Sequence, residues 1–273
     1  QEGEKEMSLN KSKLDYKWVI LITCFFMEFL CLGFCSSNIG LYTVPVTNAL
    51  GIDRLAYSTW SSIRYGVQVF VALYFGALMN RFGIKKMVLL GLCALLGATV
   101  LRAVGTNVLH FYIAGALHGV GIVFVGSTMA GTIVRQWFHQ DVGKYTGIVM
   151  SANGIGGAIA AQVISPIINN GETFGYRKAY LLSAAITLAI SVVILIFLRD
   201  HPSDGPVVPG KQKKMPKTSV LWVGIEYDVV KKKAYFYVAA ALIFLTGISQ
   251  QSIGNITIVY MTDLGFAPAF IAT

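Results

Sequence analysis

The sequence has 273 residues, of which 55% are hydrophobic and only 13% are charged, with a net charge of +9. About a quarter of the residues of a soluble domain are charged, so this composition excludes an ordinary soluble domain and is typical of a membrane protein. The positive charge does not indicate a nucleic-acid partner, because the cations lie in the gaps between apolar runs.

Seven apolar runs are each about long enough to cross a hydrocarbon core of ~30 Å as helices that rise ~1.5 Å per residue. The predicted spans are Lys17–Ala49, Tyr57–Met79, Met87–Val104, Val108–Val134, Thr146–Ile168, Ala179–Leu198 and Ala234–Thr262, and a further run begins at Phe266. The first run is too long for one perpendicular span, so its outer end at Gly40–Pro45 is expected to kink or to continue above the bilayer.

Basic residues gather in alternate connections, which places those connections and the N-terminus in the cytoplasm by the positive-inside rule. The predicted protein is an integral, multi-pass protein of the plasma membrane. We expect a cytoplasmic segment at 1–16, a six-helix bundle at 17–199, a cytoplasmic linker at 200–233 and the start of a second bundle at 234–273. Within the proline-rich linker, Ser219–Lys233 could form an amphipathic helix on the inner leaflet or remain a solvated chain.

A short basic turn joins the second and third spans. Its notable residues are Gly76, Asn80, Arg81, Gly83, Lys85 and Lys86. Gly83 allows a left-handed or close backbone, and the three cations can contact lipid phosphate and the carboxyl ends of helices. A generic positive-inside loop is the simpler interpretation.

Six spans, a basic linker and this turn resemble the major facilitator superfamily, whose corresponding turn reads roughly Gly-x-Leu-Ala-Asp-Arg-x-Gly-Arg-Lys. Asn80 stands where the aspartate is usual, so the turn lacks the anion that a charged latch to a second bundle would need. The resemblance implies twelve spans in two bundles. The chain is therefore expected to be truncated after its seventh span.

Two further segments are most similar to the monocarboxylate and oxalate/formate branch of that superfamily. They are Gly131–Gly147, which contains Trp137-Phe138, and the small-residue run Ser151–Gly157, where glycines permit close helix packing. Proton-coupled members often carry an arginine four residues before a Gly-x-Gly in the fourth span, but Gly115 stands there in this sequence.

Polar residues within the spans are the candidates for a substrate cavity. They are Glu28, Arg64, Gln68, His118, Asn153, Gln250 and Gln251. Glu28 lies near the bilayer midplane, where a charged carboxylate costs several kcal/mol, so it should be protonated, paired or facing a wet cavity. Arg64 could snorkel outward, pair with Glu28, or hold an anion with its guanidinium fork. Arg102 lies near the outer end of the third span, and snorkelling is expected there.

These features favour a secondary transporter that moves a small organic anion, such as a monocarboxylate, by alternating access, with protons as a possible coupling ion. An exporter of drugs or other hydrophobic solutes, and a channel or membrane receptor, are the alternatives. No catalytic residues, cofactor or metal site are predicted, so the protein is not expected to be an enzyme. It is expected to be a monomer that contacts membrane lipid.

Overall fold

The computed structural model describes residues 16–138, 140–168, 170, 172–200 and 230–264, without the side chains of 250–259, 262 and 263. The described residues form helices and no strands, which confirms the predicted all-α membrane fold. Five described helices are long and apolar enough to cross a membrane, and a bent helix pair makes a sixth.

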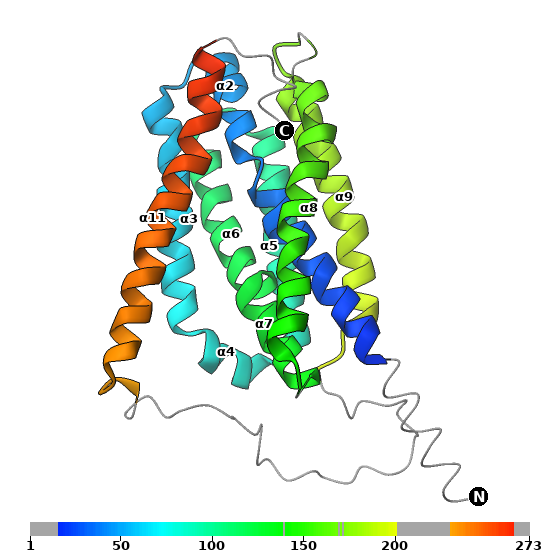
Figure 1. Ribbon diagram of the computed structural model, residues 1–273. Coiled ribbons are helices and arrows are strands. Elements are labelled where there is room, and N and C mark those ends of the chain that lie inside the picture. The colour runs from blue at the N-terminus through cyan, green and yellow to red at the C-terminus, as the bar shows by residue number, and fades with distance from the viewer. Residues whose placement is uncertain (1–15, 139, 169, 171, 201–229, 265–273) are drawn as a thin grey trace, which may run out of the picture.

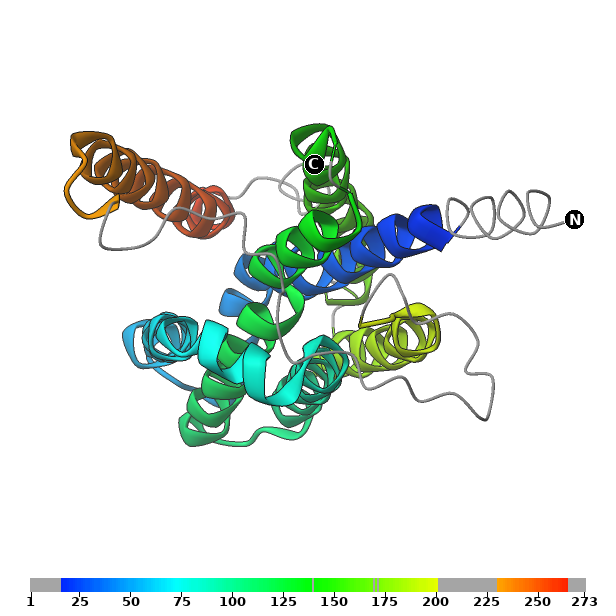
Figure 2. The same ribbon diagram turned by 90° about the horizontal axis from the view of Figure 1, so that it is seen from below.

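The spans follow one another as an up-and-down bundle (Figure 1). The first runs from residue 16 to Leu50 and contains the π-helix η1 (Phe29–Phe34) and the helix α2 (Ile39–Leu50). The next elements are α3 (Arg54–Leu73), α4 (Phe75–Phe82), α5 (Ile84–Val104), α6 (Val108–Val125), α7 (Ser127–Trp137), α8 (Val142–Ile168), α9 (Gly175–Phe197) and α11 (Ala234–Asp263). Helix α11 contacts α2 and lies beside the bundle rather than within it (Figures 1 and 2).

The first span is interrupted earlier than expected. The irregular part lies at η1 and the turn that follows it, whereas Pro45 is accommodated inside α2. The hydroxyls of Ser36 and Ser37 donate hydrogen bonds to the backbone carbonyls of Cys31 and Leu32. Each bond reaches five residues back along the chain. These bonds support the wider π-helical turn, and π-helical turns are frequent at functional sites.

The second span was predicted as one helix, but it bends by 62° between α3 and α4. Tyr74 lies at the bend, and its N–H donates to Val71 across a tightened turn. The basic turn follows, with Gly83 at a φ of 78° and a ψ of 166°. A residue with a side chain is strained at such a φ, which explains the glycine there.

Glycines bring two pairs of spans into direct backbone contact. A Cβ added to Gly156 of α8 would lie 2.6 Å from the carbonyl oxygen of Phe29, and Gly33 approaches α8 equally closely. A Cβ added to Gly119 of α6 would lie 2.5 Å from the carbonyl oxygen of Arg64. The close packing predicted for the small-residue run therefore occurs at Gly156, and a second such contact joins α3 to α6.

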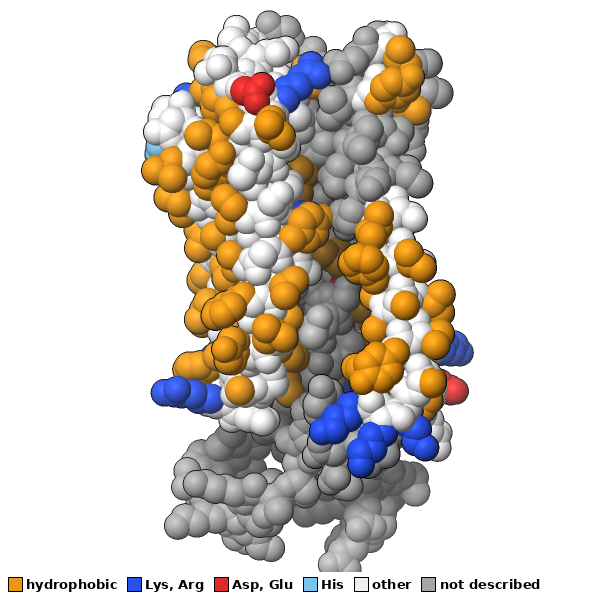
Figure 3. Space-filling model, turned by 90° about the vertical axis from the view of Figure 1, so that its left-hand side faces the viewer, with side chains coloured by type: hydrophobic (Ala, Val, Ile, Leu, Met, Phe, Trp, Pro, Cys, Tyr) orange, Lys and Arg blue, Asp and Glu red, His pale blue; other side chains and the backbone are white. Residues whose placement is uncertain are grey.

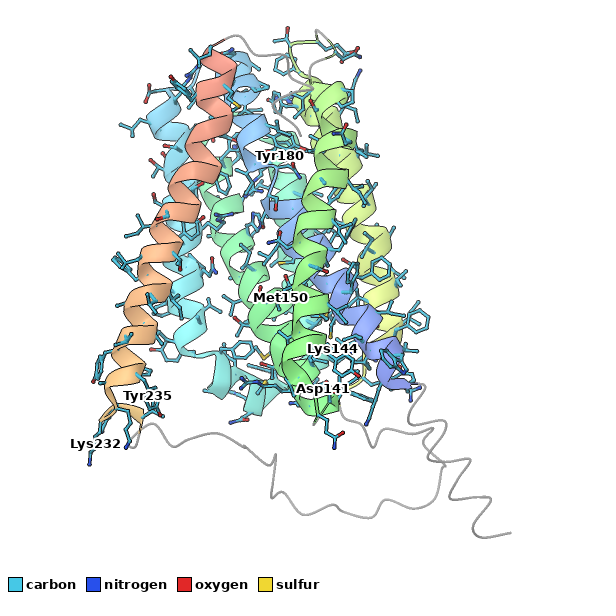
Figure 4. All side chains as sticks on the ribbon, in the orientation of Figure 1. Asp141, Lys144, Met150, Tyr180, Lys232 and Tyr235 are labelled. Carbon is cyan, nitrogen blue, oxygen red and sulfur yellow. The ribbon has the colours of Figure 1, made fainter. Side chains whose placement is uncertain are left out.

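The two ends of the bundle differ in charge. Figure 4 places Lys144 at the lower end of α8 and Lys232 at the lower end of α11. Figure 3 shows Lys and Arg side chains gathered at the same end of one face, below flanks covered with hydrophobic side chains. This is the end that the sequence assigns to the cytoplasm. The predicted cytoplasmic segments at 1–16 and 200–233, including most of Ser219–Lys233, lie largely outside the described residues and remain predictions.

Candidate substrate-binding site

A chain of hydrogen bonds crosses the interior of the bundle. Arg102 of α5 approaches His118 of α6, with 2.9 Å between its Nη2 and the ring Nδ1. The other ring nitrogen, Nε2, lies 3.0 Å from the hydroxyl of Ser36. Ser36 in turn bonds the Cys31 carbonyl at 2.8 Å. The network therefore connects the third and fourth spans to the irregular part of the first.

The hydrogen-bonding partners of His118 determine its protonation state and its tautomer. An arginine side chain only donates hydrogen bonds, so Nδ1 must be the acceptor and must carry no proton. Since the Ser36 hydroxyl donates its proton to the Cys31 carbonyl, it accepts from the Nε2–H of His118. The ring is consequently neutral, with its proton on Nε2.

Trp60 of α3 lies at the centre of this region. Its ring stacks parallel to the His118 ring, with 6.5 Å between the centroids. The guanidinium carbons of Arg102 and Arg64 lie 4.3 Å and 5.6 Å from the Trp60 centroid. Both arginines thus make cation–π contacts with one aromatic ring.

The two arginines are buried. Arg64 is 6% exposed and Arg102 is 3% exposed, and among the described residues the Nε of each has no hydrogen-bond partner. Within the part of the chain that the structure describes, neither forms an ion pair with an aspartate or glutamate. The snorkelling expected of Arg102 was wrong, because the acceptor on His118 and the face of Trp60 hold its side chain inside the bundle.

Glu28 lies at a second buried position. Its side chain is fully buried, and neither carboxyl oxygen has a hydrogen-bond partner in the part of the chain that the structure describes. The described structure contains no ion pair between Glu28 and Arg64.

The other predicted cavity residues differ in their surroundings. The Oδ1 of Asn153 lies 3.1 Å from the Ser37 hydroxyl. The buried Oε1 of Gln68 has no hydrogen-bond partner among the described residues. Gln250 and Gln251 belong to α11, but their side chains lie outside the described part. All of these remain predicted cavity residues.

The basic turn lies away from the buried network. Asn80, Arg81, Lys85 and Lys86 are exposed, while Gly76 and Gly83 are partly buried. The carboxylate of Asp200, just beyond α9, accepts a hydrogen bond from the Lys85 N–H in the first turn of α5 at 2.6 Å. An acid from the end of the sixth span therefore stabilises the amino end of α5.

Sequence reasoning identified Arg64 and His118 but missed Trp60, Ser36 and the role of Arg102. Trp60 and Arg64 are four residues apart and therefore share a face of α3, which could have suggested their contact. The pairing of Arg102 with His118 depends on how α5 packs against α6, and no local pattern reports that. The structure also explains Gly115, since a Cβ there would lie 2.6 Å from the carbonyl oxygen of Trp60.

Comparison with known proteins shows which family the chain belongs to. Over 230 residues the chain is 28% identical to monocarboxylate transporter 11 of Homo sapiens, covering 83% of this chain and 46% of that protein. It is 25% identical over 198 residues to the 4-hydroxybenzoate transporter PcaK of Pseudomonas putida, covering 70% and 42%. It is 26% identical over 199 residues to multidrug resistance protein 2 of Bacillus subtilis, covering 72% and 46%.

The chain thus spans about half the length of the curated relatives that it matches. The model of the Major Facilitator Superfamily matches residues 21–273. This is a family of transporters and not of enzymes, as the sequence predicted. The chain belongs to the Major Facilitator Superfamily.

Proposed function

We propose that this protein is a secondary transporter that carries a small organic anion by alternating access, and that Arg64 binds the carboxylate of its substrate. The observation that carries the proposal is a buried guanidinium, within a membrane-spanning helix, that has no acidic partner among the described residues. An unpaired charge in such a place costs several kcal/mol. A bound anion would offset that cost.

The hydrogen-bonding geometry of arginine and the names of similar proteins both support an organic anion as the substrate. A guanidinium matches a carboxylate through two parallel hydrogen bonds, which favours Arg64 as a carboxylate-binding group. Two of the similar proteins are named as carriers of carboxylates, namely monocarboxylates and 4-hydroxybenzoate. The similarity to a multidrug resistance protein supports the export of hydrophobic solutes as the competing function.

Proteoliposomes that contain the full-length protein distinguish these functions. With excess unlabelled lactate inside, labelled lactate outside should accumulate transiently by counterflow, and competing carboxylates should reduce the signal. A channel produces no such counterflow. If lactate and 4-hydroxybenzoate are not carried while a cationic dye is, the drug-exporter function replaces this proposal.

Glu28 is the proposed site of the coupling proton. Its carboxyl is buried and has no hydrogen-bond partner among the described residues, so it can hold a proton in one conformation and release it in another when water reaches it. Glu28→Gln should preserve lactate exchange but abolish the accumulation driven by a pH gradient. Retained pH-driven accumulation in this variant would show that Glu28 is structural.

A further inference from the structure

The cluster around Trp60 contains more positive charge than Arg64 alone supplies. Arg102 is also buried, and its guanidinium carbon lies 4.3 Å from the centroid of the Trp60 ring that Arg64 contacts at 5.6 Å. Two like charges near each other in a poorly solvated interior repel one another. Within the described part of the chain neither has an acidic partner, so only the aromatic rings of Trp60 and Tyr65 and the acceptor on His118 offset this repulsion there.

We infer that Arg102 is a second substrate-binding cation, which together with Arg64 forms a two-arginine site for a carboxylate beside Trp60. This inference rests on the proposed function, because it assigns a further residue to the same substrate. Arg64 belongs to α3 and Arg102 to α5, and both helices pack against α6, which carries His118.

The hydrogen bonds of Arg102 leave donors available for a ligand. Its Nη2 is directed at His118, whereas its Nε is buried and has no partner. The Nε of Arg64 is also buried and has no hydrogen-bond partner among the described residues. A buried donor without a partner is costly, and a carboxylate has two oxygens that can accept from such donors. The unsatisfied donors are thus of the kind that a carboxylate would satisfy.

His118 is the positioning residue in this arrangement. Because its ring is neutral and its proton lies on Nε2, it accepts from Arg102 and donates to Ser36 without adding a third positive charge. A glutamine at 118 could reproduce both interactions, since an amide carries one acceptor and a donor group. A leucine could reproduce neither.

The test measures how a carboxylate stabilises the full-length protein in detergent. Increasing concentrations of butyrate should raise the thermal unfolding temperature of the wild type, and the dependence on concentration gives the affinity. Chloride at equal ionic strength is the control for screening. Loss of a hydrogen bond between two charged groups weakens binding about 10- to 100-fold, so Arg102→Gln should reduce the butyrate affinity by about that factor.

Three variants separate binding from folding. Arg102→Lys keeps the charge and should retain an intermediate affinity. His118→Leu should weaken butyrate binding, and His118→Gln should restore it. His110→Leu is the matched control on the same helix and should bind butyrate like the wild type. Within the described residues, the ring of His110 bonds only the neighbouring Asn107.

A purely structural role gives a different result. If Arg102→Gln unfolds at a lower temperature but binds butyrate as tightly as the wild type, the inference is wrong and the proposed function stands. If neither butyrate, lactate nor 4-hydroxybenzoate stabilises the wild type, the proposed function itself fails, and the two-arginine site fails with it.

Discussion

Gly119 offers a direct test of how the helix carrying Arg64 is positioned. In Gly119→Ala the new Cβ would lie 2.5 Å from the carbonyl oxygen of Arg64, 3.2 Å from the Cβ of Val67 and 3.3 Å from the N of Gln68. The contacted atoms belong to the α3 backbone or lie next to it, so no side-chain rotation relieves the overlap. Restoring an ordinary contact of at least 3.4 Å requires α3 to move by roughly 1 Å.

The loss of stability expected for Gly119→Ala is estimated by comparison with Gly97→Ala on α5. Both substitutions gain about 1 kcal/mol of helix propensity. At Gly97 the added Cβ would meet only the Leu117 side chain, at 3.7 Å, which is an ordinary contact. The difference between the variants therefore isolates overpacking, which costs about 1–3 kcal/mol. We expect Gly119→Ala to be less stable than Gly97→Ala by that amount and to transport lactate more slowly, because Arg64 is displaced.

The assay is thermal unfolding of both variants in detergent, with lactate counterflow measured on the same preparations. If Gly119→Ala is as stable as Gly97→Ala and transports lactate at the same rate, then α3 and α6 do not pack as closely as described here.

The remaining predictions concern the end of the bundle that is predicted to be cytoplasmic, and the topology. Gly83→Ala should cost about 1–3 kcal/mol of stability, because alanine is strained at the positive φ of this position. Gly76→Ala should cost nothing, because its added Cβ meets no atom. Equal thermal stability of the two variants would refute the strain at Gly83. Asp200→Ala should destabilise the protein by roughly 0.3–1 kcal/mol, and an unchanged unfolding temperature at low salt would disprove the stabilisation of α5 by this acid. In a cysteine-free background, a cysteine at Thr106 should be labelled from outside and one at Ser203 from inside, and the reverse pattern would overturn the orientation.

The helices could be predicted because each span is a long apolar run between polar connections. The breaks within spans could not. Tyr74 lies within an uninterrupted apolar run, so its neighbours give no sign that α3 and α4 meet at 62°. The π-helical turn at Phe29–Phe34 depends on Ser36 and Ser37, whose hydroxyls can bond several different carbonyls.

For the candidate site, the sequence singled out individual residues but not the contacts between them. Depth within a span identified Arg64, His118 and Glu28 as unusual, since polar groups are rare there. Depth also misled at Arg102, which is near a helix end yet turns inward. Its partner, His118, lies 16 positions away on another helix. Contacts between helices depend on their relative rotation, which glycines such as Gly119 set through close backbone packing.

Lactate counterflow by Arg64→Lys tests carboxylate binding by Arg64 most directly. Lysine keeps the positive charge but loses the planar fork that bonds both oxygens of a carboxylate. The concentration of lactate at half-maximal exchange should rise about 10-fold or more, while the unfolding temperature without lactate changes little. An unchanged half-maximal concentration in a variant that is folded and active would contradict carboxylate binding by Arg64.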